Sequence, residues 1–167
     1  MPLRGRTIFV VVATWAAEAC SGTTDPRAAR ATVTVQRDTI EASRVVGGSV
    51  TWLQFTVPAA IHNAGSVSVT FSYCASVIEA PARGAWDAVW SPICALDSRA
   101  ALEIAPGETR EITVDVSAAV AGPGGPTWNS AAVDGTYRLA VGLVAAGLDG
   151  RIPQIPSNSF RLIERSQ

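Results

Sequence analysis

The sequence predicts an all-β protein, an antiparallel β-sandwich of about seven to nine short strands. Three observations lead to this prediction. Apolar residues recur at every second position through most of the chain, as in strands with one buried face. Turn-forming glycine, proline, asparagine and aspartate interrupt this alternation at intervals of roughly 8–12 residues. No segment has the spacing of a convincing amphipathic helix, although residues 76–80 and 115–121 could each form a helical turn.

The first half of the body contains three alternating segments separated by glycine-containing breaks. Val33 and Val35 begin the alternation, and Gly47-Gly48 interrupts it. The run 50–57 changes phase between Trp52 and Leu53, as a β-bulge or a strand buried on both faces would require. After a predicted turn at Asn63-Ala-Gly65 comes the most regular strand, with four apolar side chains on one face: Val67, Val69, Phe71 and Tyr73.

The second half repeats this arrangement after a less regular middle region. A turn at Ala105-Pro-Gly-Glu108 is predicted because proline presets φ and glycine accepts a positive φ. The segment 121–126 is rich in glycine and proline and is expected to form a long loop. Asp134-Gly135 and Asp149-Gly150 are turn dipeptides. The apolar positions that alternate around these breaks are Leu102, Ile104, Ile112, Val114, Val116, Tyr137, Leu139, Val141, Leu143, Phe160 and Leu162.

Several short motifs occur in an order typical of one kind of sandwich. They are Asn63 after an apolar run, Pro106-Gly107-Glu108, and the late strand Gly135-Thr-Tyr-Arg138. Together they resemble a group of bacterial immunoglobulin-like domains found in lipoproteins and surface proteins, over roughly residues 50–163. Intracellular proteinase inhibitors of the same sandwich type resemble the pattern less closely. The resemblance implies an immunoglobulin-like fold and an envelope location, and it supplies no catalytic residues.

The N-terminus is typical of an export signal. Two arginines precede an apolar stretch at 7–17, and small residues lead to Cys20. The cysteine resembles the lipid-attachment residue of bacterial lipoproteins, although an ordinary signal peptidase would cut the same bond. We therefore expect a signal peptide at 1–19, a flexible tether at 20–30 and the domain at 31–167. The expected location is the cell envelope, anchored by lipid in the outer membrane of a diderm host, with a secreted or periplasmic protein as the alternative.

The three cysteines fit this location. If Cys20 carries lipid, Cys74 and Cys94 remain as a pair in an oxidising compartment, where a structural disulfide is expected. Such a bridge would join a strand end to the segment that follows it. A redox or metal site is disfavoured because there is no C-x-x-C motif and His62 is the single histidine.

Composition and motifs argue against several other functions. The net charge of −1 offers no basic patch for nucleic acid. No serine lies in a nucleophile elbow, and the acidic residues do not follow a calcium-loop pattern. We therefore expect no catalytic residue, no metal and no cofactor, and we expect a monomer.

The tryptophans offer the best candidate for a binding surface. Trp86, Trp90 and Trp128 lie near irregular segments, where exposed aromatic side chains could contact a protein or a glycan of the envelope. The alternative is that they cover the apolar core. The sequence thus predicts an envelope binding or structural module. Two alternatives remain open: an inhibitor of an extracytoplasmic protease that acts through a loop at 79–92 or 121–128, and an envelope hydrolase with an unrecognised site.

Overall fold

The computed structural model describes residues 30–94, 101–121, 125–145 and 154–165. The predicted signal peptide, Cys20, the tether and the Asp149-Gly150 turn lie outside these residues. Within them the protein is all-β, with nine strands and no helix, and so without any helix long and apolar enough to cross a membrane. The strands are β1 (Ala31–Val35), β2 (Thr39–Gly47), β3 (Val50–Asn63), β4 (Val69–Ala82), β5 (Ala85–Trp90), β6 (Leu102–Ile104), β7 (Thr109–Ala121), β8 (Gly135–Ala145) and β9 (Ile155–Glu164).

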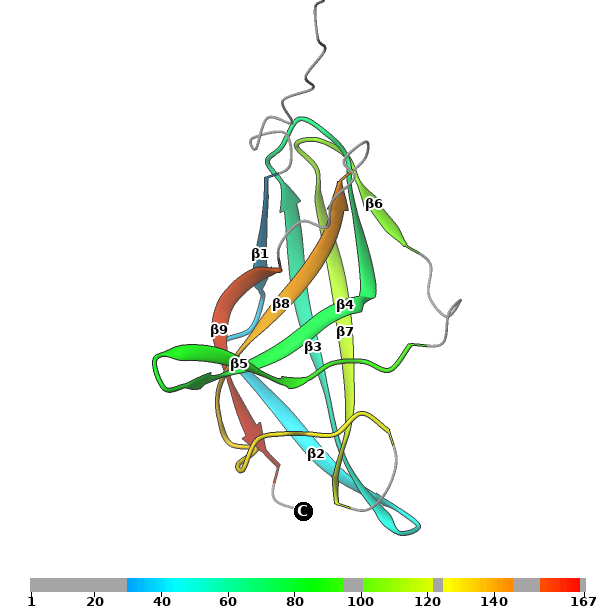
Figure 1. The fold of residues 1–167 in the computed structure, drawn as a ribbon, viewed down its shortest axis with the longest axis vertical. Helices are drawn as coiled ribbons and strands as arrows, with labels where there is room; N and C mark the ends of the chain where they lie inside the picture. Colours follow the sequence, from blue (N-terminus) through cyan, green and yellow to red (C-terminus); the bar gives the residue numbers. More distant parts are fainter. Residues whose placement is uncertain (1–29, 95–100, 122–124, 146–153, 166–167) are drawn as a thin grey trace, which may run out of the picture.

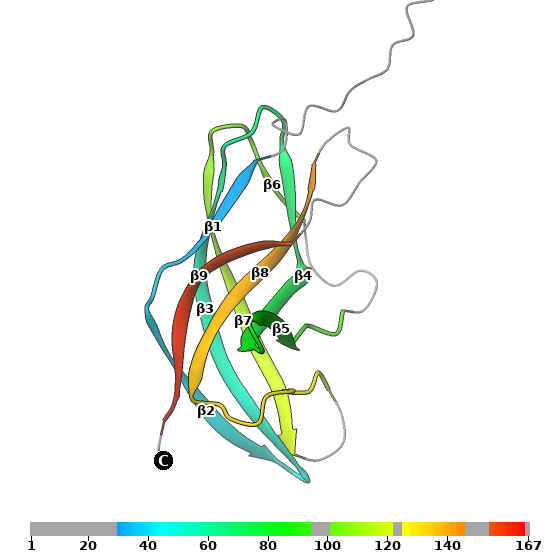
Figure 2. The same ribbon diagram turned by 60° about the vertical axis from the view of Figure 1, so that its left-hand side comes forward.

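All nine strands are joined into one open mixed sheet (Figures 1 and 2). Strand β3 pairs antiparallel with β1, β2 and β7. Strand β4 pairs antiparallel with β5, β6 and β8, and β8 pairs antiparallel with β9. Strand β2 connects these two groups because its first half runs parallel to β9 and its second half runs antiparallel to β3. The β2–β9 pair is the one parallel pair among the described strands, so the sheet is mixed and not purely antiparallel as the sequence predicted.

The predicted alternation produces a single apolar core. The inward-facing residues of the long strands are almost fully buried, and the outward-facing ones are mostly polar. In β3 the buried set is Leu53, Phe55, Val57, Ala59 and Ile61; in β7 it is Ile112, Val114, Val116 and Ala118; in β8 it is Tyr137, Leu139, Val141 and Leu143. These strands are therefore held in register by burial of one face.

Two turns that the sequence predicts are joined by one buried side chain. Asn63 is fully buried, and its Nδ2 donates to the carbonyl oxygens of Val67 at 2.8 Å and Ile104 at 3.0 Å. Its Oδ1 accepts from Gly65 N at 3.0 Å, which closes an Asx-type turn. The Gly107 N–H donates to the Asn63 carbonyl at 2.8 Å, and Gly107 has the positive φ of 75° expected in the Pro-Gly turn. The β3–β4 and β6–β7 connections are thus fixed to each other.

Strand β4 is interrupted by a large, irregular β-bulge. Its pairing with β8 is regular up to Phe71 and resumes at Ser76, so that four residues of β4 have no register partner on β8. Phe71 is buried before the bulge, and Ser76 and Ile78 are buried after it, which reverses the phase of alternation. The predicted strand 66–73 therefore continues much further than expected, and its inward face changes within the bulge.

Two local predictions differ from the structure, the helical turns and the position of the phase change in β3. Residues 76–80 and 115–121 form no helical turn: they belong to β4 and β7, where partner strands satisfy the backbone. The phase change predicted between Trp52 and Leu53 corresponds to a register irregularity one residue earlier, between Thr51 and Trp52, in the pairing with β7.

Candidate binding surface

Two of the three tryptophans predicted to form a binding surface lie in the core. Trp90 is 2% exposed and Trp128 is 7% exposed. Trp128 packs edge-on against Phe55 with ring centroids 5.7 Å apart, and its ring centroid lies 5.3 Å from that of Tyr137. The prediction that these two tryptophans are exposed is therefore wrong, because their large side chains pack into the apolar core.

Trp86 is half-buried and lies under an arginine. The Arg138 guanidinium carbon is 4.5 Å from the centroid of the Trp86 ring, and Arg138 Nε lies 2.6 Å from Glu79 Oε2. Glu79 and Arg138 are direct partners across β4 and β8, so this is the cross-strand pairing expected of an outward-facing arginine. One face of Trp86 is thus already occupied within the protein.

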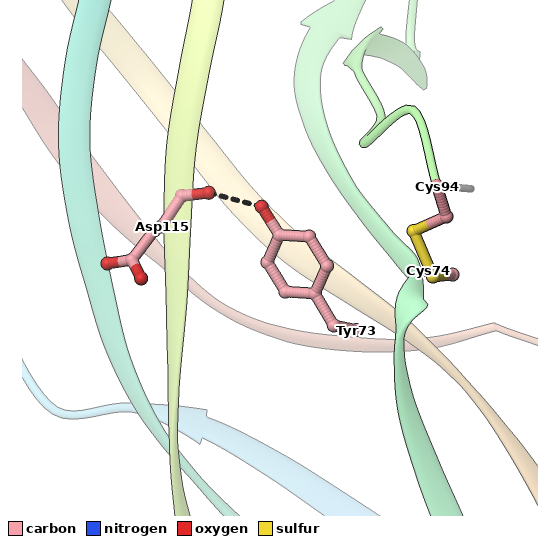
Figure 3. The surroundings of a disulfide bond; sticks show 4 residues. All are labelled: Tyr73, Cys74, Cys94 and Asp115. Atoms are coloured by element: carbon pink, nitrogen blue, oxygen red, sulfur yellow. Dashed lines mark hydrogen bonds between the residues drawn. A yellow bond between two sulfur atoms is a disulfide. The ribbon is translucent and has the colours of Figure 1, made fainter. Parts of the chain in front are cut away.

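The predicted disulfide between Cys74 and Cys94 is present (Figure 3). Cys74 lies in the bulge in the middle of β4 rather than at a strand end, and Cys94 lies just beyond β5. Tyr73 and Cys74 point in opposite directions: the sulfur reaches Cys94, whereas the Tyr73 hydroxyl donates to the Asp115 carbonyl on β7. The bulge therefore connects β4 to two separate parts of the fold.

Aromatic side chains cover part of the edge of β7 that faces away from β3. Besides Tyr73, which bonds to the Asp115 carbonyl, Trp90 donates from Nε1 to the Ser117 carbonyl at 3.2 Å. Two residues further on, Ala119 exchanges backbone bonds with the segment that follows Gly125. Along 115–119 these groups take the place of a neighbouring strand.

A hollow of about 780 Å³ opens where β2 separates from β3. Strand β2 pairs with β3 only up to Ser43 and Gln54 and then turns away to pair with β9. We call this site the β2–β3 hollow; its lining residues are Arg37, Thr39, Ile40, Glu41, Ser43, Gln54, Phe55, Thr56, Asp115, Val116 and Ser117. Ile40, Phe55 and Val116 belong to the core, and the other lining residues are polar.

The polar groups around the β2–β3 hollow are mostly exposed and only partly engaged. Thr56 Oγ1 donates to Asp115 Oδ1 at 3.1 Å across the β3–β7 pair. Glu41 Oε2 lies 2.9 Å from Arg165, and both side chains are more than half exposed. The hollow therefore offers hydroxyl, amide, carboxylate and guanidinium groups to a ligand without disturbing the core.

A second, smaller hollow of about 420 Å³ lies beside the disulfide. Cys74, Gly142 and Val144 are among its lining residues, together with Ser76. The Ser76 hydroxyl is buried and has no hydrogen-bond partner among the described residues. The backbone of β8 comes close to the bulge here, and a Cβ at Gly142 would lie 3.0 Å from that of Ala75. The bulge in β4 thus creates this smaller hollow.

The remaining sequence candidates have structural surroundings. His62 lies on β3 opposite Thr109, with its Nδ1 3.0 Å from Thr109 Oγ1. No group of three or more histidine, cysteine or acidic side chains in the described residues could hold a metal ion. The segment 79–92 is mostly a paired β4–β5 hairpin rather than a loop; Arg83 and Gly84, both with positive φ, form its two-residue turn. Of the other proposed loop, 121–128, residues 122–124 lie outside the described structure.

Comparisons with known proteins do not assign a family. No family model matches the chain, and no curated protein matches it. One similar solved structure is the X-ray structure of Northeast Structural Genomics Consortium target SoR45, which is 15% identical in sequence. The match covers 81% of this chain and 86% of that one, with a TM-score of 0.44.

Proposed function

We propose that this chain is an exported binding module of the bacterial cell envelope, anchored through lipid on Cys20, that acts by recognition rather than by catalysis. The observation that carries the binding role is the β2–β3 hollow. It is about 780 Å³ in size, and most of its side chains are polar and lie outside the apolar core. Polar side chains gathered around an open hollow are available for recognition, whereas the buried tryptophans are not.

We also infer that the strands form an immunoglobulin-like sandwich. Tyr137 lies near the start of β8, and its hydroxyl donates to the Ala132 carbonyl at 2.9 Å. A tyrosine at this position, bonded to the backbone a few residues upstream, is a recurring feature of immunoglobulin-like sandwiches. The buried faces of β3, β7, β4 and β8, which contribute to one core cluster, support the same interpretation.

The disulfide supports the envelope location. Disulfides persist in oxidising compartments, and pairing of Cys74 with Cys94 leaves Cys20 as the odd cysteine. Strand β1 starts opposite Asn63 at one end of β3, and the β2–β3 hairpin lies at the other end (Figures 1 and 2). A tether before β1 would therefore hold the molecule by the end away from that hairpin, with the β2–β3 hollow accessible between the two ends.

The anchor can be tested in a diderm bacterium that expresses the full chain. We expect labelled palmitate to be incorporated into the wild type and not into Cys20→Ala, and the intact mass to correspond to a lipidated chain beginning at Cys20. An unlipidated chain beginning at Cys20 would indicate a secreted or periplasmic protein instead. An uncleaved chain whose Cys74 and Cys94 react as free thiols would contradict export altogether.

A further inference from the structure

We propose that the β2–β3 hollow binds an extended peptide segment with a basic side chain, whose main chain pairs with the backbone of Thr56. This inference rests on the proposed role as a binding module and names the class of ligand. Three features of the hollow support it: a gap in the strand pairing at Thr56, an apolar floor below a polar rim, and an exposed carboxylate.

The first feature is the gap in the pairing of β3. Strand β2 pairs with β3 up to Gln54, and β1 pairs with it from Ala59 onward. Between them, the Pro58 carbonyl accepts from Gln36 N at 3.0 Å. Alternate residues of a strand direct their backbone groups to the same side, so Thr56 directs its N–H and C=O into the gap. No strand of the described chain pairs with Thr56 on that side, and an extended peptide would supply the missing partner.

The second feature is the arrangement of apolar and polar groups. Ile40 and Phe55 line the hollow and belong to the core, whereas the surrounding side chains are polar. An extended peptide alternates its side chains between two sides and so matches a hollow that is apolar below and polar at its rim. A glycan is less suited, because Phe55 is the one aromatic lining residue and only 6% of it is exposed for stacking against a sugar ring.

The third feature is the charge at the rim. The Asp115 carboxylate accepts a hydrogen bond from Thr56 and forms no ion pair within the described chain. Glu41 adds a second carboxylate, held by the exposed Arg165, and Arg37 is the one cation among the lining residues, so the lining carries two carboxylates and one guanidinium. A lysine or arginine on the ligand would pair with Asp115, which selects basic over acidic peptides.

Thr56→Pro tests the backbone contact directly. Proline removes the N–H that points into the gap, and Pro58 shows that β3 accepts proline at the same phase without losing its pairing with β7. Thr56→Val is the matched control, because it keeps the N–H and removes the hydroxyl that bonds to Asp115. Asp115→Asn tests the charge.

The probe is an acetylated and amidated hexapeptide of alternating valine and lysine, titrated into the full chain purified from the expressing bacterium. We expect the peptide to bind the wild type, and Thr56→Pro to weaken binding about tenfold, the effect of losing one backbone hydrogen bond. Thr56→Val should change the affinity by less than about threefold. Asp115→Asn should lower the affinity for the lysine peptide and leave the affinity for the glutamate peptide unchanged. The same peptide with glutamate in place of lysine should bind at least about tenfold more weakly.

Several results would overturn the proposal. These are no binding of the lysine peptide by the wild type, equal affinity of the wild type and Thr56→Pro, or equal affinity for the glutamate peptide. Binding of a tetramer of N-acetylglucosamine in place of the peptide would identify a glycan site. If Thr56→Pro does not fold, hydrogen exchange of the Thr56 amide in the wild type decides the question, since the bound peptide must protect it. Lipidation of Cys20 is measured separately, so the anchor and the ligand can fail independently.

Discussion

The side chain of Asn63 donates a hydrogen bond to the Ile104 carbonyl at 3.0 Å, and so connects residues 41 positions apart in the sequence. The same amide nitrogen donates to Val67, and the amide oxygen accepts from Gly65. An asparagine is suited to this position because a single planar amide provides two donors and one acceptor. These three hydrogen bonds explain why a polar residue is fully buried at the end of the longest apolar alternation.

We expect Asn63→Ala to destabilise the protein by about 3 kcal/mol, because it removes the side-chain hydrogen bonds to the carbonyls of Val67 and Ile104 and to the Gly65 N–H. Asn63→Asp should cost at least as much at neutral pH, since a carboxylate would face two carbonyl oxygens. The free energy of unfolding in urea measures both effects. The exposed Asn129 provides the control, and Asn129→Ala should change the stability by less than about 0.5 kcal/mol. Equal effects at the two positions would contradict the role assigned to Asn63.

The strands that the sequence predicts well are those with long, regular alternation. Strand β2 is missed because only Ile40 and Ala42 are buried in it, and the remainder forms an exposed hairpin arm. Strand β5 is missed for a similar reason, since its buried residues are Val89 and Trp90 alone. The alanine-rich stretch 117–121 favours a helix locally, but pairing with β3 overrides that propensity.

The candidate site is much harder to predict than the strands. The β2–β3 hollow exists because β2 changes partners at Ser43, and no local pattern records such a change. Its polar groups come from distant segments, such as Arg37 and Asp115, and they form no motif. The tryptophans are the candidates that the sequence offers, but large aromatic residues near irregular segments can be exposed or buried. Composition does not distinguish the two cases.

The disulfide should contribute about 3 kcal/mol to stability by restricting the unfolded chain, since it closes a loop of 20 residues. We expect the Cys74→Ala, Cys94→Ala double variant to lose this amount in urea unfolding. Reductant should lower the stability of the wild type to that of the variant and leave the variant unchanged. Two reactive thiols at these positions in denatured, unreduced wild type would contradict the bond.

Gly125 should be more sensitive to substitution than Gly107. Both have positive φ, so alanine is strained at either position, but a Cβ at Gly125 would lie 2.4 Å from the Trp52 ring, whereas none would meet an atom within 4 Å at Gly107. We expect Gly125→Ala to cost about 1 kcal/mol more than Gly107→Ala in urea unfolding. The difference should disappear in a Trp52→Leu background, and its persistence there would exclude the ring as the cause.

Tyr137 should make the stability depend on alkaline pH. Burial raises the pKa of Tyr137 in the folded protein, whereas in the unfolded chain it titrates near its usual value of about 10. The contribution of the neutral phenol is therefore fully present below about pH 10 and is lost as the pH rises through the folded pKa, because the unfolded state releases its proton first. We expect the free energy of unfolding to fall more steeply above pH 10 in the wild type than in Tyr137→Phe.

Tyr137→Phe should also be less stable than the wild type at pH 7, by about 1 kcal/mol for the lost bond to Ala132. The chain has one other tyrosine, and making both measurements in a Tyr73→Phe background leaves position 137 as the one tyrosine that differs. Identical slopes in the wild type and Tyr137→Phe would show that burial of this phenol does not govern the alkaline limit.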